Sequence, residues 1–227
     1  MFIPIYDLNP LRSIRFQFVT IGLIAANVIV FFLQMTGMPL DVIVSFAVVP
    51  SELLNVSGEM QTTSVWVPER LTPLSYMFFH GDIFHLASNM LFLWVFGDNV
   101  EDALGHVKFL FFYLACGVVG GLAHAMMMPT SNMPLIGASG AVAGVIAAYL
   151  MLHPRVRVWV LIFRFIPIRI TAAFALGAWI LTQFVMVLIP EAGPVAWWAH
   201  IGGLAAGAVL VVILKKPGVR LFDRGLA

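Results

Sequence analysis

The stretch FLFFYLACGVVGGLAHAMMMPTSNMPLIGASGAVAGVIAAYLMLHP, residues 109–154, contains no Asp, Glu, Lys or Arg. A charged side chain at the centre of a bilayer costs about 2.5–3.5 kcal/mol on insertion scales, so a long charge-free stretch favours a membrane location. This stretch is long enough for two helical crossings. Pro129, Asn132 and Pro134 lie near its middle and favour a turn between the two helices.

The composition of the whole chain supports the same environment. Its 227 residues are 61% hydrophobic and 10% charged, whereas a soluble domain is about 45–50% apolar and about 25% charged. The formal net charge of +1 gives no basic excess of the kind that neutralises phosphates, so we expect no nucleic-acid partner. The single cysteine, Cys116, excludes a disulfide within the chain.

Charge-free intervals elsewhere predict four further crossings, at residues 16–40, 83–97, 170–190 and 192–214. The sequence therefore predicts an all-α polytopic membrane protein, a bundle of six transmembrane helices. We expect one domain, residues 1–227, with its core at about 16–214. Eleven of the twelve Lys and Arg residues fall on one side of this topology, so the positive-inside rule predicts short cytoplasmic tails at both termini.

The first outer loop, about residues 38–80, contains the apolar segment DVIVSFAVVPSELL. This segment is too short to span a bilayer, so we expect it to lie in the membrane interface or against the bundle. The loop also carries Arg70, the one Lys or Arg on the outer side, and His80, a predicted structural anchor.

Four polar side chains inside the predicted crossings mark a candidate site, because polar groups in hydrocarbon are costly and suggest function. Ser139 begins a short fourth helix, and His200 lies about 9 Å into the sixth helix from its outer end. His85 and Asn89 lie one turn apart on one face of the second helix. We therefore expect all four groups at one depth, in the outer half of the membrane.

Small residues at GxxxG spacing predict that the fourth and sixth helices pack closely. They are Gly140 and Gly144 on the fourth helix, and Gly203 and Gly207 on the sixth. Packing of these two faces would bring Ser139 toward His200.

These residue types suit acyl transfer. Imidazole can accept the proton of a serine hydroxyl, which makes Ser139 a candidate nucleophile and His200 a candidate base. His85, Asn89 and the backbone N–H groups at Ser139 can donate to a developing oxyanion. No aspartate lies at the same depth, so the sequence predicts a Ser-His dyad rather than a triad.

Four motifs resemble those of the rhomboid intramembrane serine proteases. They are HLASN at 85–89, GDNVEDALG at 97–105, GASG at 137–140 and AHIGGLAAG at 199–207, which are similar to HxxxN, GxxxExxxG, GxSG and AHxxGxxxG. The resemblance implies structural roles for Gly137, Gly140, Gly144, Gly203, Gly207, Glu101 and Arg70. Glu101 is expected to be a hydrogen-bond partner of a loop.

The resemblance implies a six-helix rhomboid fold and a serine endopeptidase that cleaves transmembrane segments of membrane proteins near the outer side of the bilayer. Ser139 would attack the scissile carbonyl, and His200 would serve as base and then as acid. His85 and Asn89 would bind the oxyanion. The implied partners are single-pass membrane proteins and membrane lipid, and no metal or organic cofactor is implied.

The sequence departs from the family pattern at two places. Family members often carry an aromatic residue four positions after the serine, on the catalytic histidine, whereas this chain has Ala143. Trp197 and Trp198 are then candidates to orient His200. Many relatives carry a Trp-Arg pair in the first outer loop where this chain has Glu69-Arg70, and we expect Arg70 to keep the structural role.

Two alternatives stay open at this point. A rhomboid-like binding or quality-control protein without activity typically lacks the serine or the histidine, and both are present here. A transporter would favour an internal duplication or broken helices at matched positions, and neither is evident. HExxH and paired aspartates are also missing, which disfavours metalloprotease and aspartyl chemistry.

The N-terminus does not resemble a transit peptide, which favours a bacterial cytoplasmic (inner) membrane.

Overall fold

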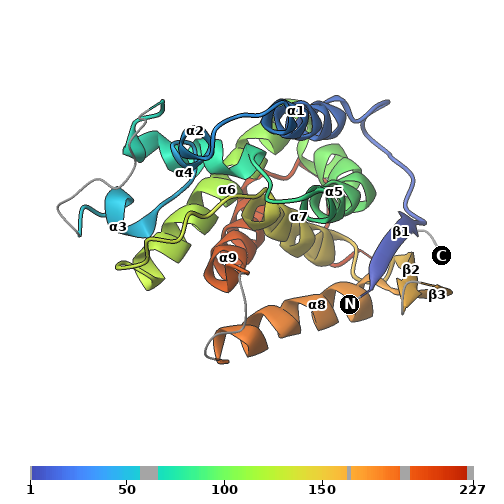
Figure 1. Ribbon diagram of the computed structural model, residues 1–227. Coiled ribbons are helices and arrows are strands. Elements are labelled where there is room, and N and C mark those ends of the chain that lie inside the picture. The colour runs from blue at the N-terminus through green and yellow to red at the C-terminus, as the bar shows by residue number, and fades with distance from the viewer. Residues whose placement is uncertain (1, 57–65, 163–164, 190–194, 224–227) are drawn as a thin grey trace.

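Six long helices form the bundle of this computed structural model, which describes residues 2–56, 66–162, 165–189 and 195–223 (Figure 1). In those parts of the chain, the helices of fourteen or more residues are α1 (Phe18–Met35), α5 (Ile83–Leu104), α6 (His106–Met127), α7 (Ser139–Leu152), α8 (Ala172–Val187) and α9 (Trp197–Leu214). They occur in the order of the predicted crossings.

Three of these helices, α1, α6 and α9, are long and apolar enough to cross a membrane by length and composition. Helices α7 and α8 are also apolar but have only 14 and 16 residues. At 1.5 Å per residue, α7 rises about 21 Å, less than the roughly 30 Å of hydrocarbon. A helix of this length can therefore begin inside the membrane and still reach the opposite surface.

The segment between α1 and α5 forms short helices that pack on the bundle. They are α2 (Leu40–Val44), α3 (Pro50–Leu53), α4 (Thr72–Ser75) and the 3₁₀ helices η1 (Glu69–Leu71) and η2 (Tyr76–Phe78). Ala47 and Val48 are fully buried, and Val48 pairs with Leu135 in a two-way backbone hydrogen bond. This part of the predicted outer loop therefore packs against the bundle. Arg70 lies exposed on η1, and residues 57–65 of the loop lie outside the described residues.

The prediction of an all-α fold is wrong in one respect, because the chain also forms a three-stranded antiparallel sheet in the order β1-β2-β3. The strands are β1 (Ile3–Asp7), β2 (Arg157–Ile162) and β3 (Ile166–Thr171). Val158 and Val160 are fully buried on one face, while Trp159 between them is partly exposed. This alternation of buried β-branched residues with a more exposed residue suits a half-buried strand. The count of charges that located the crossings could not detect it.

The segments nearest the two chain ends lie at the same end of the bundle as the sheet (Figure 1). Strand β1 pairs with β2, which follows α7. The N–H groups of Phe222 and Asp223 donate to the carbonyls of Met151 and Leu152 at the end of α7. The segments nearest both chain ends are thus held at the end of α7.

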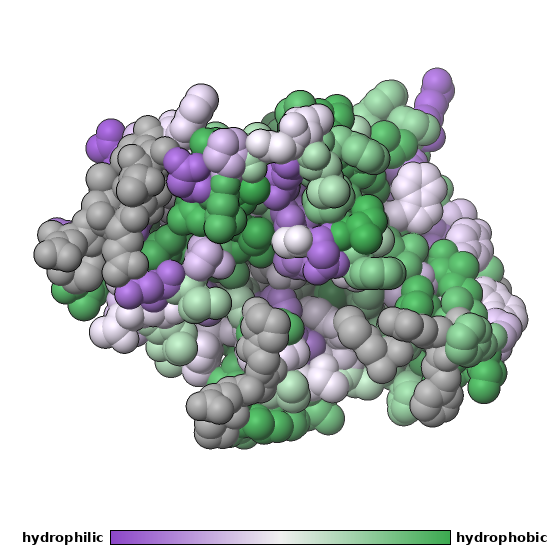
Figure 2. Space-filling model, in the orientation of Figure 1, coloured by the Kyte–Doolittle hydropathy of each residue, from purple (hydrophilic) through white to green (hydrophobic). Residues whose placement is uncertain are grey.

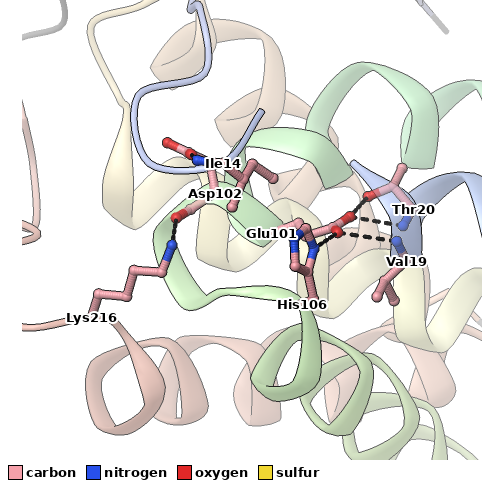
Figure 3. A network of polar contacts seen from close by, with 7 residues as sticks. All are labelled: Ile14, Val19, Thr20, Glu101, Asp102, His106 and Lys216. Carbon is pink, nitrogen blue, oxygen red and sulfur yellow. Dashed lines mark hydrogen bonds and ion pairs between the residues drawn. The ribbon is translucent and has the colours of Figure 1, made fainter. Parts of the chain in front are cut away.

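Helix α5 continues past residue 97, where the charge-free interval ends. It can do so because the carboxylates of Glu101 and Asp102 accept hydrogen bonds from backbone N–H groups (Figure 3). Glu101 is fully buried and accepts from the N–H groups of Val19 and Thr20, from the Thr20 hydroxyl, and contacts His106. These N–H groups lie in the first turn of α1, which has no side-chain cap of its own. A carboxylate is stabilised at such a helix start.

Asp102, the next acidic residue, binds the chain that leads into α1. Its two carboxylate oxygens accept from the backbone N–H groups of Arg12, Ser13 and Ile14, and the Lys216 ammonium donates to its carbonyl. The end of α5 thus fixes both the start of α1 and the segment after α9.

Helix α9 packs most extensively against α6 and α7, and glycines allow the close approach. A Cβ atom on Gly203 would overlap the carbonyl of Gly140, and one on Gly207 would overlap the carbonyl of Gly144. Backbone therefore lies directly on backbone along the contact of α7 and α9. This contact brings the start of α7 beside the first turn of α9.

Candidate active site

Ser139 is the first residue of α7 and is half-buried. The preceding Gly137 has φ +127°, and its N–H donates to the carbonyl of Tyr76. A Cβ atom at Gly137 would lie 2.6 Å from the ring of His85. Glycine is therefore required there both by the backbone angle and by the approach of the imidazole. The turn presents Ser139 at a helix start, where the first N–H groups have no intrahelical acceptor.

His200 lies in the first turn of α9 with only 7% of its surface exposed. Its Nε2 atom lies 2.8 Å from the Oγ atom of Ser139. The backbone contact of Gly203 with Gly140 sets this distance, because each glycine lies within one turn of the corresponding site residue. The structure thus brings the two candidate catalytic groups into hydrogen-bond distance.

Helix α5 carries the other two predicted site residues, His85 and Asn89. Asp82 caps this helix, and its carboxylate accepts from the N–H groups of Phe84 and His85. His85 lies against Gly137, two residues before Ser139. Asn89 is 6% exposed, and its Nδ2 atom is buried with no hydrogen-bond partner among the described residues. An amide donor that is buried without an acceptor is available to a ligand.

His80, just before α5, is a buried neighbour of this group. Its ring lies 5.0 Å from the ring of His85 in an edge-to-face arrangement, and its Nε2 atom accepts from the N–H of Ala138 at 3.5 Å. Burial lowers the pKa of His80 to about 4, so the ring is neutral near pH 7 and retains an acceptor nitrogen. His80 thus supports the turn that carries Ser139.

Sequence reasoning missed two residues of α8 that contact His200. The Oε1 atom of Gln183 lies 2.8 Å from His200 Nδ1, and the ring of Trp179 lies 5.8 Å from the imidazole. Trp197, one of the two candidates, lies 5.9 Å away in an edge-to-face arrangement. One signal was present in the sequence: Gln183 is the only amide side chain in the interval 170–190.

Ala143, at the position where family members often have an aromatic residue, is fully buried and packs in a small cluster with Ala147, Leu204 and Trp179. The space beside α7 is therefore filled in part by an aromatic ring from α8. Trp179 contacts both this cluster and His200.

The surface agrees with a polar site in an apolar bundle. Figure 2 shows hydrophilic residues gathered near the middle of one face, over the region where α7 begins, with hydrophobic residues on both sides. Within the described ranges, no group of three His, Cys, Asp or Glu side chains lies close enough to hold a metal ion. The groups with contacts at this site are the hydroxyl of Ser139, the imidazoles of His200 and His85, and the amide of Gln183.

Comparison with known proteins identifies the family. The model of the Rhomboid domain matches residues 68–217, so this chain belongs to the rhomboid family and is an integral membrane protein. The resemblance inferred from the four motifs is thereby confirmed.

Named relatives come from several organisms. The presenilin-associated rhomboid-like protein of Homo sapiens, described as mitochondrial, is 30% identical over 82% of this chain and 45% of its own length. RHOMBOID-like protein 12 of Arabidopsis thaliana, also described as mitochondrial, is 30% identical over 66% of this chain and 48% of its own. The Rhomboid protease GluP of Bacillus subtilis is 31% identical over 78% of this chain and 32% of its own length. The chain therefore spans about half the length of these relatives or less.

Proposed function

We propose that this protein is a serine endopeptidase that cleaves transmembrane segments of membrane proteins near the outer side of the bilayer. The observation that carries this proposal is the 2.8 Å separation of Ser139 Oγ from His200 Nε2. The description of the Bacillus subtilis relative as a rhomboid protease supports the same activity. Its substrates are single-pass transmembrane proteins.

The reaction begins with the hydroxyl of Ser139. His200 Nε2 takes its proton as Oγ attacks the scissile carbonyl carbon, and the imidazolium then gives that proton to the leaving amine. The resulting acyl-enzyme is an ester of Ser139. A water molecule, deprotonated by the same nitrogen, then hydrolyses this ester and releases the carboxyl product.

The oxyanion of each tetrahedral intermediate is stabilised by preorganised donors. The free Nδ2 group of Asn89, the ring of His85 and the N–H of Ser139 supply them. His85 lies beside Gly137, which supports its approach to a carbonyl bound at Ser139.

The proposed topology has six membrane crossings in one domain, residues 1–227, with both termini in the cytoplasm. The common end of the bundle that holds β1 and the segment after α9 supports an even number of crossings. The charge bias of Lys and Arg supports the orientation. A bacterial cytoplasmic membrane stays a prediction, since relatives described as mitochondrial also match this chain.

Labelling with a serine-directed fluorophosphonate tests the proposed function. We expect the protein, purified in detergent, to be labelled at Ser139, because only an activated hydroxyl attacks the phosphorus centre at an appreciable rate. Mass spectrometry of the modified peptide locates the label. Ser88, an exposed serine of α5, is the internal control and should stay unmodified. Labelling of both serines at equal, slow rates would refute activation of Ser139.

Removal of the amide donor of Asn89 is expected to lower kcat for a fluorogenic transmembrane peptide. Loss of one oxyanion donor typically costs about 10²–10³-fold in kcat, and we expect a value in this range for Asn89→Ala. Ser88→Ala removes a neighbouring polar group that is exposed and bonds its own helix backbone, and should retain wild-type activity. Full activity of Asn89→Ala would remove Asn89 from the oxyanion site.

A further inference from the structure

Gln183 on α8 is a polar side chain in an apolar helix, and its burial is nearly complete, with 2% of its surface exposed. Its Oε1 atom lies 2.8 Å from His200 Nδ1, on the side of the imidazole opposite to Ser139. The three side chains Gln183, His200 and Ser139 thus form one chain of hydrogen bonds across three helices.

The orientation of the Gln183 amide is set by its own donors. Its Nε2 group donates to the carbonyl of Trp179 at 2.8 Å and to the hydroxyl of Thr182 at 3.0 Å. The reverse orientation would place Oε1 against the carbonyl oxygen of Trp179, two acceptors with no proton between them. Gln183 therefore presents an acceptor to His200.

This acceptor decides which nitrogen of His200 carries the proton. A neutral imidazole has one N–H donor and one acceptor nitrogen. Since Gln183 Oε1 can only accept, the proton lies on Nδ1, and Nε2 has a lone pair directed at the hydroxyl of Ser139. The opposite tautomer would leave two lone pairs facing each other at Gln183.

We infer that Gln183 is a positioning residue that holds His200 in the tautomer able to accept the proton of Ser139. This inference rests on the proposed function, and it gives the Ser-His pair a neutral third member where serine hydrolases commonly have a carboxylate. A neutral amide suits this depth in the bundle, because an ionised carboxylate is costly to bury in hydrocarbon. The rings of Trp179 and Trp197 pack on the imidazole and restrict its rotation.

Two substitutions at Gln183 separate hydrogen bonding from packing. Gln183→Met keeps the length of the side chain but removes the acceptor, so Nδ1–H is left buried without a partner. Loss of this hydrogen bond is expected to decrease kcat by about 10–100-fold. KM for a transmembrane peptide should change by less than about twofold. Gln183→Glu retains an acceptor and is expected to keep more activity than Gln183→Met. Leu181→Met, on an exposed position of the same helix, is the matched control and should behave as wild type.

The ¹⁵N NMR spectrum of labelled histidine reports the tautomer directly. We expect a protonated Nδ1 and an unprotonated Nε2 for His200 in the wild type, and a mixture of tautomers in Gln183→Met. Unchanged kcat in Gln183→Met, or equal losses in both variants with an unchanged tautomer, would overturn the inference. If the wild type is labelled by fluorophosphonate, either of these outcomes refutes only the role of Gln183 and leaves the proposed function intact. If the wild type is not labelled, the proposed function itself fails.

Discussion

Alanine at Ser139 or at His200 is expected to lower kcat by about 10⁴–10⁶-fold, and the double variant should be no worse than either single variant. Residues that act as one catalytic unit show this strong non-additivity, because the base has no task without the nucleophile and the nucleophile is not activated without the base. Because Ser139 Oγ lies 2.8 Å from His200 Nε2, we expect the two groups to act as such a unit. Cleavage of a fluorogenic transmembrane peptide in detergent measures all three variants.

A matched histidine control separates this effect from general damage. His153 lies after the last residue of α7, at the other end of the helix that begins with Ser139. His153→Gln should retain wild-type kcat. The two groups do not act together if each single variant retains half of the activity or more and the losses add in the double variant.

The helices of the bundle could be predicted because each one lacks charge over most of its length. The prediction ended the second crossing at residue 97, although α5 continues to Leu104. Glu101 and Asp102 are accommodated inside the fold by backbone N–H groups from the start of α1 and the chain before it. A hydropathy argument counts such carboxylates as exposed, since the donors that stabilise them are 81 to 90 residues away in the sequence.

The sheet could not be predicted in the same way. Strand β1 and strand β2 are separated by most of the chain, and each is only five or six residues long. Their pairing depends on the end of α7 lying beside the N-terminal segment. A local pattern does not contain that information, although the alternation in RVWVLI was readable as a strand.

The candidate site was predictable where polar side chains interrupt apolar helices at motif spacing. Ser139, His200, His85 and Asn89 share this property, and the structure brings Ser139 and His200 into hydrogen-bond distance. Gln183 also interrupts an apolar helix, but it does not lie at motif spacing from any other polar residue. Its contact with His200 arises from the packing of α8 on α9, which no single helix specifies.

Gly203→Ala is expected to destabilise the protein more than alanine at any other glycine of the described helices, because its Cβ atom would make the closest overlap, with the carbonyl oxygen of Gly140. The new Cβ atom would overlap the carbonyl of Gly140, which is backbone and cannot move as a side chain can. Overpacking costs typically about 1–3 kcal/mol and occasionally more, and here α7 and α9 must separate along their whole contact. Separation would also move His200 from Ser139. We therefore expect a lower midpoint of thermal unfolding in detergent and a loss of fluorophosphonate labelling together.

Gly177→Ala on α8 is the matched control, because a Cβ atom there meets nothing within 4 Å. Alanine is favoured over glycine in a helix interior by about 0.5–1 kcal/mol, so this variant should unfold at the wild-type temperature or slightly above it. The two substitutions add the same methyl group to the same kind of helix and differ only in what lies opposite. Equal unfolding temperatures for Gly203→Ala and Gly177→Ala would mean that α7 and α9 do not touch through their backbones, and the placement of Ser139 beside His200 would lose its structural cause.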